Sequence, residues 1–418
     1  MMNYPGVVNK NKETLSKIIT VGSRPNDGHA PLLFGKSLYA YVIVGLGSDH
    51  QCTNAKEAME KLRMGKHIMI RQGTHEKNLQ DLIVMINEFK SSHMSLVSDD
   101  RSPADLKENG HIDYLIQSAI SLGLTPIRAI QMGSINTARY FGLENLGAIA
   151  PGFKTDFVLL DDLESFKISQ AFLDGKPIEN LGPNRTGPTN INDKNFLHDF
   201  PFLRNTMHVK SLDNPNMFTI HTISNDVSST LMQVIGVIPG QIITEKRTLP
   251  ASVNGRCEAI ADATQDLAKL TIIERHHRTG NIGLGFVQGL GLERGAIASS
   301  VAHDSHNLVV AGMDDLDMLI VARDVSSIGE GLSVVIDKQV ISNFPLPITG
   351  LMSVADIDSV ITSLDILNTA CLKLGFKVIK DPFMLLSFLA LHVIPSLKFT
   401  DNGLVDVDNF RYTSLWID

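Results

Sequence analysis

The sequence predicts an α/β protein of more than one domain, and three observations support this fold class. Apolar stretches of strand length alternate with amphipathic helical stretches over residues 1–145. A turn-rich segment of β-like character follows at 146–180, and a second α/β region occupies 216–418. The length of 418 residues also exceeds one ordinary hydrophobic core, which agrees with two or three domains.

The first region shows the alternation most clearly. Residues 53–65 have a Thr or Asn cap, apolar side chains at helical spacing and a final glycine, which together predict a helix. The predicted helices are 53–65, 75–90, 111–123 and 125–142, and the predicted strands are 67–73 and 94–100. This order is typical of parallel strands with crossover helices, but it does not separate a closed barrel from an open sheet.

The next two segments differ in character. Residues 156–161 and 168–178 predict strands of a small antiparallel sheet, with Asp174-Gly175 as the hairpin turn. Residues 181–215 are rich in Asn, Pro, Gly and Asp and have little periodicity, so they predict a linker or irregular excursion, with early proteolytic cuts in 181–195.

The C-terminal region, 216–418, is expected to form a domain of its own. Residues 318–323 and 332–341 predict strands. The longest apolar run, 383–394, is too short to span a bilayer and predicts a buried helix.

Composition and charge narrow the class of protein. The apolar fraction of 43% and the charged fraction of 20% are typical of globular proteins. The formal net charge of −8, with both signs interspersed, argues against nucleic-acid partners. Cys52, Cys257 and Cys371 are too far apart for a disulfide framework, and neither a signal-peptide pattern nor a membrane span is expected, so the sequence favours the cytoplasm.

His29, His50 and Asp99 each follow a predicted strand end or turn. In a parallel α/β fold the carboxyl ends of strands converge on one mouth, where these side chains would suit Zn²⁺, Fe²⁺ or Mn²⁺. Such a cation lowers the pKa of bound water, and a carboxylate beside it can move a proton. The alternative is that all three are turn and cap residues, with Asp99 capping a helix near Pro103, and spacing alone leaves both interpretations open.

A further polar cluster contains His303, Asp304 and His306. Two histidines three positions apart share one face of a helix and could hold a second metal, whereas on a strand they would point to opposite faces. A hydrogen-bonded polar surface is the favoured interpretation. The glycine-rich residues 279–291 lack the full dinucleotide fingerprint and a P-loop lysine, so their glycines predict tight packing.

Ordered sequence motifs extend along nearly the whole chain. They are MMNYPGV at the start, DGHAP at 27–31, GLGSDHQCT at 45–53, MIRQG at 69–73, SDDRSPADLKENGHIDYL at 98–115, GAIAPGFKTDFVLLDDL at 147–163, the long stretch 275–307, and LPITGLMS at 346–353. In order and spacing these motifs resemble the adenine deaminases of the amidohydrolase superfamily.

The resemblance implies a fold and a reaction. Residues 1–145 would be the C-terminal half of a metal-dependent TIM barrel, 146–180 part of a small β-sandwich, and 216–418 the family's separate C-terminal α/β domain. The reaction would be hydrolytic deamination of adenine, a small purine base, to hypoxanthine and ammonia by a metal-bound hydroxide. The implied cofactor is Mn²⁺ or Fe²⁺, binuclear in the complete enzyme, with Zn²⁺ less favoured, and a complete enzyme is expected to be a homodimer.

The resemblance also assigns roles to individual residues. His29 and His50 match metal ligands on the fifth and sixth barrel strands, and Asp99 matches the eighth-strand aspartate that binds metal and moves protons. His50 and Asp99 are therefore the expected catalytic residues. Gln51 stands where the family usually has Glu, and Gln cannot act as a base.

The family's first-strand His-x-His pair and fourth-strand carboxylate have no counterpart before His29. We therefore expect weak metal binding by this chain alone. A misplaced start of the reading frame, an inactive remnant, and a separate chain that supplies the N-terminal part are the alternatives that remain open. Another amidohydrolase, acting on a cyclic amide, is the alternative activity.

Overall fold

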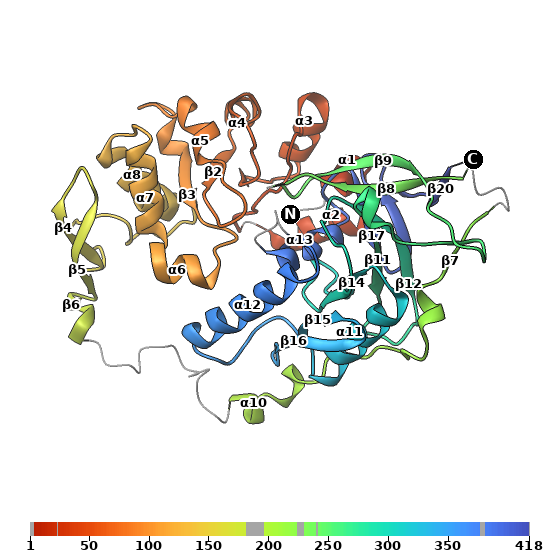
Figure 1. Cartoon of the computed structure of the whole chain (residues 1–418). Helices are drawn as coiled ribbons and strands as arrows, with labels where there is room; N and C mark the ends of the chain where they lie inside the picture. The colour runs from red at the N-terminus through yellow and green to blue at the C-terminus, as the bar shows by residue number, and fades with distance from the viewer. Residues whose placement is uncertain are drawn as a thin grey trace. The chain divides into compact units, whose positions relative to one another are not determined.

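The computed structural model describes residues 4–22, 24–180, 196–223, 230–239, 241–376 and 381–417. The chain divides into two compact units, Met1–Pro188 (unit 1) and Thr189–Asp418 (unit 2), whose elements are labelled in Figure 1. The division lies inside the predicted linker 181–215. Residues 181–195, where early proteolytic cuts are expected, lie outside the described residues.

A parallel sheet forms the centre of unit 1. Its strands are β1 (Ser48–Asp49), β2 (His67–Arg71) and β3 (Met94–Val97), in that order. Every residue of β2 is buried, as expected for a parallel strand with both faces covered. The pairing confirms parallel strands with crossover helices, whereas half of a closed barrel stays a prediction because the described part of this sheet has three strands.

Helices surround this sheet. The helix α4 packs against β2, and α7, α8 and α9 pack against β3 (Figure 1). The helices are α1 (Tyr4–Val8), α2 (Lys12–Val21), α3 (Gly35–Ile43), α4 (Ala55–Arg63), α5 (Leu79–Leu82), α6 (Pro103–Asn109), α7 (Ile112–Ser121), α8 (Pro126–Gly133) and α9 (Ile135–Tyr140). The core between helices and sheet is built around Ile68, Ile70, Leu96 and Leu115.

Two predicted helices of unit 1 are wrong in extent. The helix predicted over 125–142 is interrupted at Ser134 and forms α8 and α9. Instead of a helix over 75–90, the chain forms the one-turn helix α5 and then a 3₁₀ turn, Ile83–Met85. Successive β-branched residues at Ile83 and Val84 weaken an α-helix, and the buried Leu79, Leu82 and Met85 follow a spacing of three that suits the tighter turn.

A small antiparallel sheet completes unit 1 and confirms the strands predicted within 146–180. Its strands are β4 (Phe157–Asp162), β5 (Lys167–Leu173) and β6 (Lys176–Pro177). Asp174 and Gly175 connect β5 to β6, and both have positive φ, 49° and 73°, as a two-residue type I′ hairpin requires. A β-sandwich built on this sheet stays a prediction.

Unit 2 is built on a nine-stranded sheet whose pairs are antiparallel except for β8 with β12. Its order is β16-β15-β13-β14-β11-β12-β8-β20, with β9 also on β8. The strands of unit 2 are β7 (Ile220–His221), β8 (Leu231–Val237), β9 (Thr244–Pro250), β10 (Glu258–Ala259), β11 (Leu267–Ile273), β12 (Ile282–Gln288), β13 (Ala296–Ser299), β14 (Leu308–Gly312), β15 (Gly331–Ile336), β16 (Gln339–Pro345), β17 (Leu397–Thr400), β18 (Gly403–Asp406), β19 (Arg411–Tyr412) and β20 (Trp416–Ile417).

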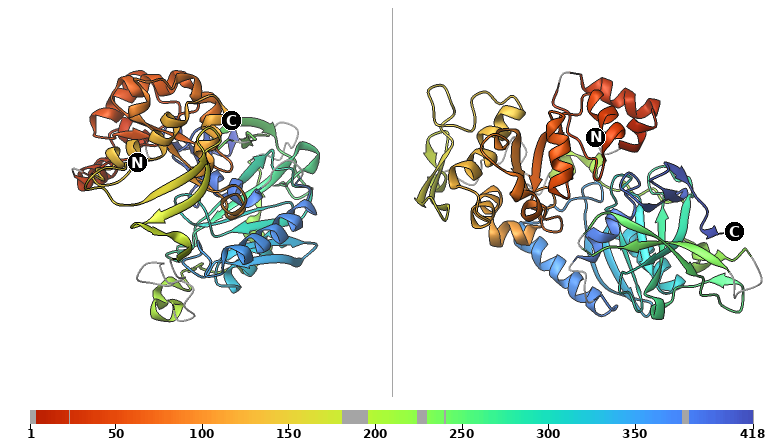
Figure 2. Two further views of the ribbon diagram at one scale, coloured as in Figure 1. Left: turned by 90° about the vertical axis from the view of Figure 1, so that its left-hand side faces the viewer. Right: turned by 90° about the horizontal axis from the view of Figure 1, so that it is seen from above.

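Helices cover both faces of this sheet (Figure 2). The helices of unit 2 are α10 (Phe196–Asp199), α11 (Asp315–Ser327), α12 (Ile357–Leu372) and α13 (Pro382–Leu389). The helix α11 covers one face of the sheet, and α12 and α13 cover the other. Alternate residues of the strands point to opposite faces, so Val309 joins the core under α12 and α13, whereas Val310 joins the core under α11. Unit 2 therefore has a hydrophobic core on each side of its sheet.

Three predictions for unit 2 needed correction. Residues 318–323 belong to the buried helix α11 and not to a strand, and Asp314 caps this helix through its side chain. Residues 332–341 form two strands, β15 and β16, because Asp337 and Lys338 turn the chain. The buried helix predicted at 383–394 ends at Leu389. Within the described residues, no helix is long and apolar enough to cross a bilayer.

Candidate active site

His29 and His50 lie side by side in unit 1. Nδ1 of His29 is 3.1 Å from Nε2 of His50, and the two rings meet edge to face with centroids 5.0 Å apart. His50 directly follows β1, and His29 lies in the extended segment before α3. The structure therefore brings together two of the three residues that the sequence proposes as metal ligands.

Asp27 orients His50, and the sequence analysis did not assign it to the site. Asp27 Oδ2 is 2.9 Å from Nδ1 of His50, and its Oδ1 accepts a 2.5 Å hydrogen bond from the Ser48 hydroxyl. Burial raises the pKa of Asp27, but the hydrogen bonds and charge of His50 outweigh burial and lower the pKa overall. A carboxylate on Nδ1 keeps the proton there and leaves the lone pair on Nε2, which faces His29. The sequence signals for Asp27 were its place at the start of the DGHAP motif and its position two residues before His29.

The His29 ring has the properties of a metal ligand. Burial, with the charges of His50 and Arg71, lowers the pKa of His29 well below its ordinary value, so the ring is neutral at neutral pH. Its Nε2 is buried and has no hydrogen-bond partner among the described residues, while Tyr41 accepts the backbone N–H of His29 at 2.9 Å. Nδ1 of His29 and Nε2 of His50 face each other and fit a divalent cation as two of its ligands when the proton of the neutral His29 ring is on Nε2.

Asp99 forms an ion pair with Arg71. Its Oδ2 is 2.7 Å from Nη1 of the buried Arg71, whose Nη2 donates to Gln51 at 3.0 Å and to Glu76 at 2.8 Å. Among the described residues, no three His, Cys, Asp or Glu side chains are close enough together to hold a metal. The predicted three-ligand set is therefore not assembled, because the buried guanidinium requires counter-charges and takes the Asp99 carboxylate.

The predicted second cluster does not gather around a common point. His303, Asp304 and His306 lie in an irregular segment between β13 and β14, and not on a helix. The two histidine rings are 6.4 Å apart, and His303 stacks on Phe388 with centroids 5.1 Å apart. These contacts agree with the alternative of polar packing.

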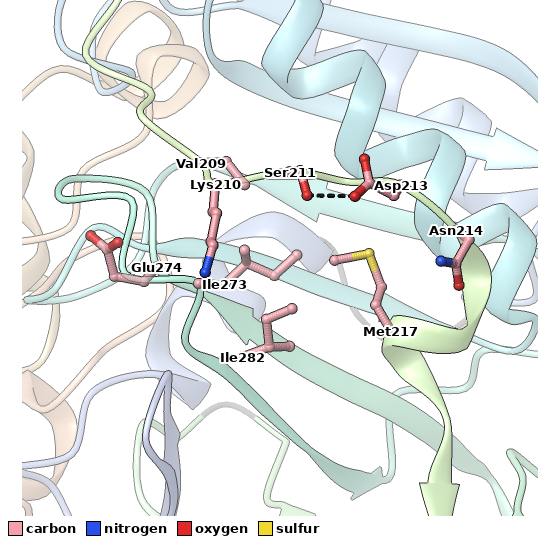
Figure 3. A pocket seen from close by; sticks show the side chains of 10 residues that line it. Val209, Lys210, Ser211, Asp213, Asn214, Met217, Ile273, Glu274 and Ile282 are labelled. Carbon is pink, nitrogen blue, oxygen red and sulfur yellow. Dashed lines mark hydrogen bonds between the residues drawn. The ribbon is translucent and has the colours of Figure 1, made fainter.

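A hollow of about 220 Å³ lies in unit 2 (Figure 3). Met217, Ile273 and Ile282 form its apolar part, and Lys210 lies beside it. The Glu274 carboxylate at its edge accepts hydrogen bonds from three backbone N–H groups, of His276, His277 and Thr279. Because this carboxylate already accepts hydrogen bonds from the backbone of its own turn, it stabilises the turn. It is therefore not available to bind a ligand in the hollow.

Both units match known protein families. Residues 35–178 match the family described as "Amidohydrolase family", and 241–411 match "Adenine deaminase C-terminal domain". The first match contains His50 and Asp99, while His29 lies just before it. A protein named adenine deaminase in Oleidesulfovibrio alaskensis is 48% identical over 100% of this chain and 70% of its own length.

This chain belongs to the adenine deaminase family. Adenine deaminase 2 of Carboxydothermus hydrogenoformans is 44% identical over 98% of the chain and 70% of its own length. The adenine deaminase of Desulfatibacillum aliphaticivorans is 43% identical over 100% of the chain and 71% of its own length. The resemblance drawn from the ordered motifs is confirmed, and it extends through both units.

Proposed function

We propose that this chain catalyses the hydrolytic deamination of adenine to hypoxanthine and ammonia, with His29 and His50 holding the catalytic cation. The observation that carries this proposal is the pair of neutral, facing imidazoles, backed by Asp27, in a chain whose relatives are named adenine deaminases. Mn²⁺ or Fe²⁺ is the proposed cation, and the cytoplasm is the proposed compartment because the three cysteines are free thiols.

The residues of the chain have separate tasks in this reaction. A bound divalent cation lowers the pKa of a water molecule that it holds. Asp27 keeps His50 in the tautomer that donates its Nε2 lone pair, and burial keeps His29 neutral. As the water oxygen bonds to C6 of adenine, Asp99 takes one of its protons and returns it to the amino nitrogen, which leaves as ammonia when the C6–N bond breaks. The second water proton ends on ring N1, so adenine and water give hypoxanthine and ammonia. Arg71, whose guanidinium also donates to Gln51, sets the position from which Asp99 acts.

The test is an assay of purified chain with adenine and Mn²⁺ or Fe²⁺, in which hypoxanthine and ammonia are both quantified. We expect cation-dependent release of the two products in equal amounts and its loss in His50→Ala and Asp99→Asn. His198→Ala, at an exposed histidine of unit 2, is the matched control and should retain the activity. If adenine is untouched but a cyclic amide is opened, the substrate is wrong, and if neither is consumed, the chain is not a catalyst by itself.

A further inference from the structure

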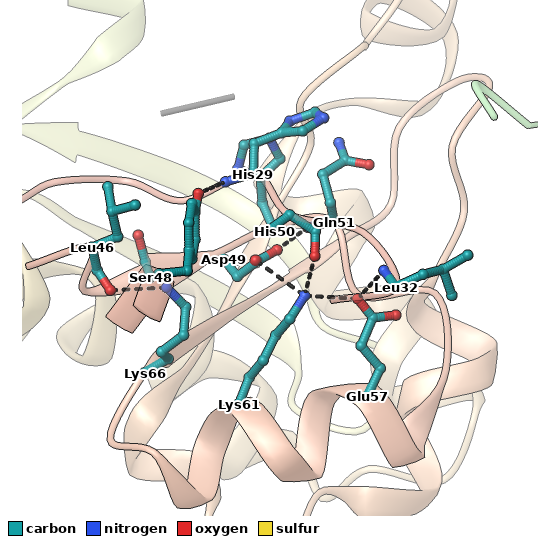
Figure 4. A network of polar contacts seen from close by, with 12 residues as sticks. His29, Leu32, Leu46, Ser48, Asp49, His50, Gln51, Glu57, Lys61 and Lys66 are labelled. Carbon is teal, nitrogen blue, oxygen red and sulfur yellow. Dashed lines mark hydrogen bonds and ion pairs between the residues drawn. The ribbon is translucent and has the colours of Figure 1, made fainter. Parts of the chain in front are cut away.

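A buried lysine connects the two histidine segments of the candidate site. Lys61, on α4, is fully buried, and its ammonium donates to the Ala30 carbonyl at 2.7 Å and to Glu57 Oε1 at 2.6 Å (Figure 4). The same ammonium is 3.1 Å from Asp49 Oδ2. Ala30 directly follows His29, and Asp49 directly precedes His50, so one side chain holds the immediate neighbours of both histidines.

Glu57 extends this connection from the previous turn of α4. Its Oε1 accepts the backbone N–H of Leu32 at 2.8 Å, and its Oε2 accepts the backbone N–H and the hydroxyl of Thr53, both at 3.1 Å. Leu32 lies on the His29 segment and Thr53 on the His50 segment. Lys61 and Glu57, four residues apart on one helical face, therefore fix both segments to the same helix.

We propose that Lys61, together with Glu57, is a positioning residue that sets the spacing and orientation of His29 and His50 for the metal. This inference rests on the proposed function and extends it, since it names the residues that hold the two metal-binding histidines in place. Neither side chain touches the substrate or the cation in this role.

Stability by itself does not explain a buried ammonium, because removing the charge from water costs free energy. Apolar side chains of similar volume often replace buried ion pairs without loss of stability, so an ion pair in a core is weak evidence for stabilisation. An ammonium has three N–H donors, and Lys61 uses them for hydrogen bonds to the Ala30 carbonyl and to Glu57, while its charge also pairs with Asp49. Burial lowers the pKa of Lys61, but Asp49 and Glu57 outweigh it and raise the pKa above its ordinary value, so the charge persists at neutral pH.

The experiment compares variants by a signal that comes from the histidine rings. Lys61→Met removes the ammonium, and Glu57→Gln/Lys61→Met removes it while leaving the net charge of the cluster unchanged. Lys398→Met is the matched control, because Lys398 is equally buried and donates to the carbonyls of Ile242 and Phe388, but lies in unit 2. Histidine-selective ¹⁵N labelling resolves the imidazole nitrogens, and His29→Asn and His50→Asn assign the two rings.

We expect Lys61→Met and the charge-balanced double variant to shift the ring signals of His29 and His50 in the absence of metal. A Zn²⁺ titration of the same samples should show affinity about tenfold or more below wild type, as for other residues that orient metal ligands. Lys398→Met should change neither the ring signals nor the affinity. If Lys61→Met does not fold, the double variant and Glu57→Gln alone carry the comparison.

The outcomes separate the two proposals. Unchanged ring signals in folded Lys61 variants overturn the positioning role, whatever happens to metal binding. If the ring signals shift in the variants but the wild-type chain binds no Zn²⁺, Lys61 positions the two histidine rings and the proposed metal site is wrong. A loss of affinity in Lys398→Met equal to that in Lys61→Met would mean that general destabilisation is responsible, and would also overturn the positioning role.

Discussion

The orientation of His50 depends on a carboxylate 23 positions earlier in the chain. Asp27 accepts from both Ser48 and His50, so one side chain fixes the strand end and the imidazole that follows it. Carboxylates behind a metal-binding histidine set its tautomer and orientation, and their loss commonly reduces metal affinity about 10- to 100-fold.

Asp27→Asn should therefore weaken Zn²⁺ binding by a factor in that range while leaving the thermal unfolding of the chain nearly unchanged. The amide keeps an acceptor of similar shape but lacks the charge that favours the Nδ1-protonated ring. Competition with a chromogenic chelator measures the affinity. Asp199→Asn, at the exposed pair of Asp199 with His198, is the control, and an equal loss in both variants would contradict the role of Asp27.

At this scale the sequence predicted the histidine pair but not its surroundings. His29 and His50 stand in motifs that a reader can recognise, and the structure brings their rings into contact. Asp27 and Arg71 also stand in such motifs and Lys61 does not, but the function of all three depends on which buried groups surround them after folding. The same limit explains Asp99, whose ion pair with Arg71 depends on the register of β2 beside β3.

At the scale of elements, β12 shows why glycine is required in one strand. An added Cβ at Gly283 would lie 1.9 Å from the backbone oxygen of Thr400, and one at Gly285 would lie 2.1 Å from the Phe399 ring. The crossing of β17 and β18 over β12 leaves no space for side chains there. This confirms the prediction that these glycines serve tight packing.

Gly283→Ala should lower the free energy of unfolding of unit 2 by about 3 kcal/mol, since a backbone oxygen cannot move aside as a flexible side chain can. Trp416, the single tryptophan of the chain, lies in β20 and reports unfolding of unit 2 by fluorescence in urea. Gly255→Ala is the control, because nothing lies within 4 Å of its added Cβ. Equal midpoints for the two variants would refute the packing argument.

The turn between β11 and β12 is organised by Glu274. Burial raises the pKa of Glu274, but the backbone N–H groups of Thr279, His277 and His276 outweigh burial and lower it from 4.5 to about 2. Because the folded pKa is below the ordinary value, this carboxylate stabilises unit 2 fully above about pH 4.5, and the contribution is lost as the pH falls toward 2.

Glu274→Gln should cost about 2 kcal/mol of unfolding free energy at pH 7, because the amide nitrogen cannot accept the N–H donors that the second oxygen accepted. The difference from wild type should shrink as the pH falls from 4.5 toward 2, where the wild-type carboxyl also loses its charge. Trp416 fluorescence in urea at several pH values measures this. A difference that stays constant across that pH range would show that charge has no part in it.

The element-level predictions failed where local pattern and tertiary environment disagree. The apolar run at 318–323 suited a strand, yet it lies in the mostly buried helix α11, and a short run of this kind does not distinguish a buried strand from a buried helix. The strands of β11, β13 and β14 are buried on both faces, so the alternation that marks a half-exposed strand is absent from them. The hairpin of β5 and β6 was predictable because its Asp-Gly turn carries the required conformation locally.

At the scale of the whole molecule, the two units differ in how well they bury apolar side chains. Unit 2 has a core on each side of its large sheet. In unit 1, several large apolar side chains have an exposed fraction of at least 78%. Among the described residues of unit 2, no large apolar side chain reaches that exposed fraction. The most exposed apolar residues of unit 1 are Ile19, Ile43, Val84, Phe89 and Ile149. Unit 1 therefore gains less free energy per residue from burial.

Limited proteolysis should accordingly degrade unit 1 first and leave a resistant fragment that begins near Thr189 and retains Trp416. Cleavage by fluctuating opening follows the local free energy of unfolding, so the less well buried unit is cut sooner when both carry accessible sites. Mass spectrometry of a trypsin time course identifies the fragments, and Gly283→Ala, which weakens unit 2 alone, should shorten the lifetime of the resistant fragment without changing that of unit 1. Equal decay of the two units in the wild-type chain would contradict the difference in burial, and would imply that another surface covers the exposed apolar side chains of unit 1 in solution.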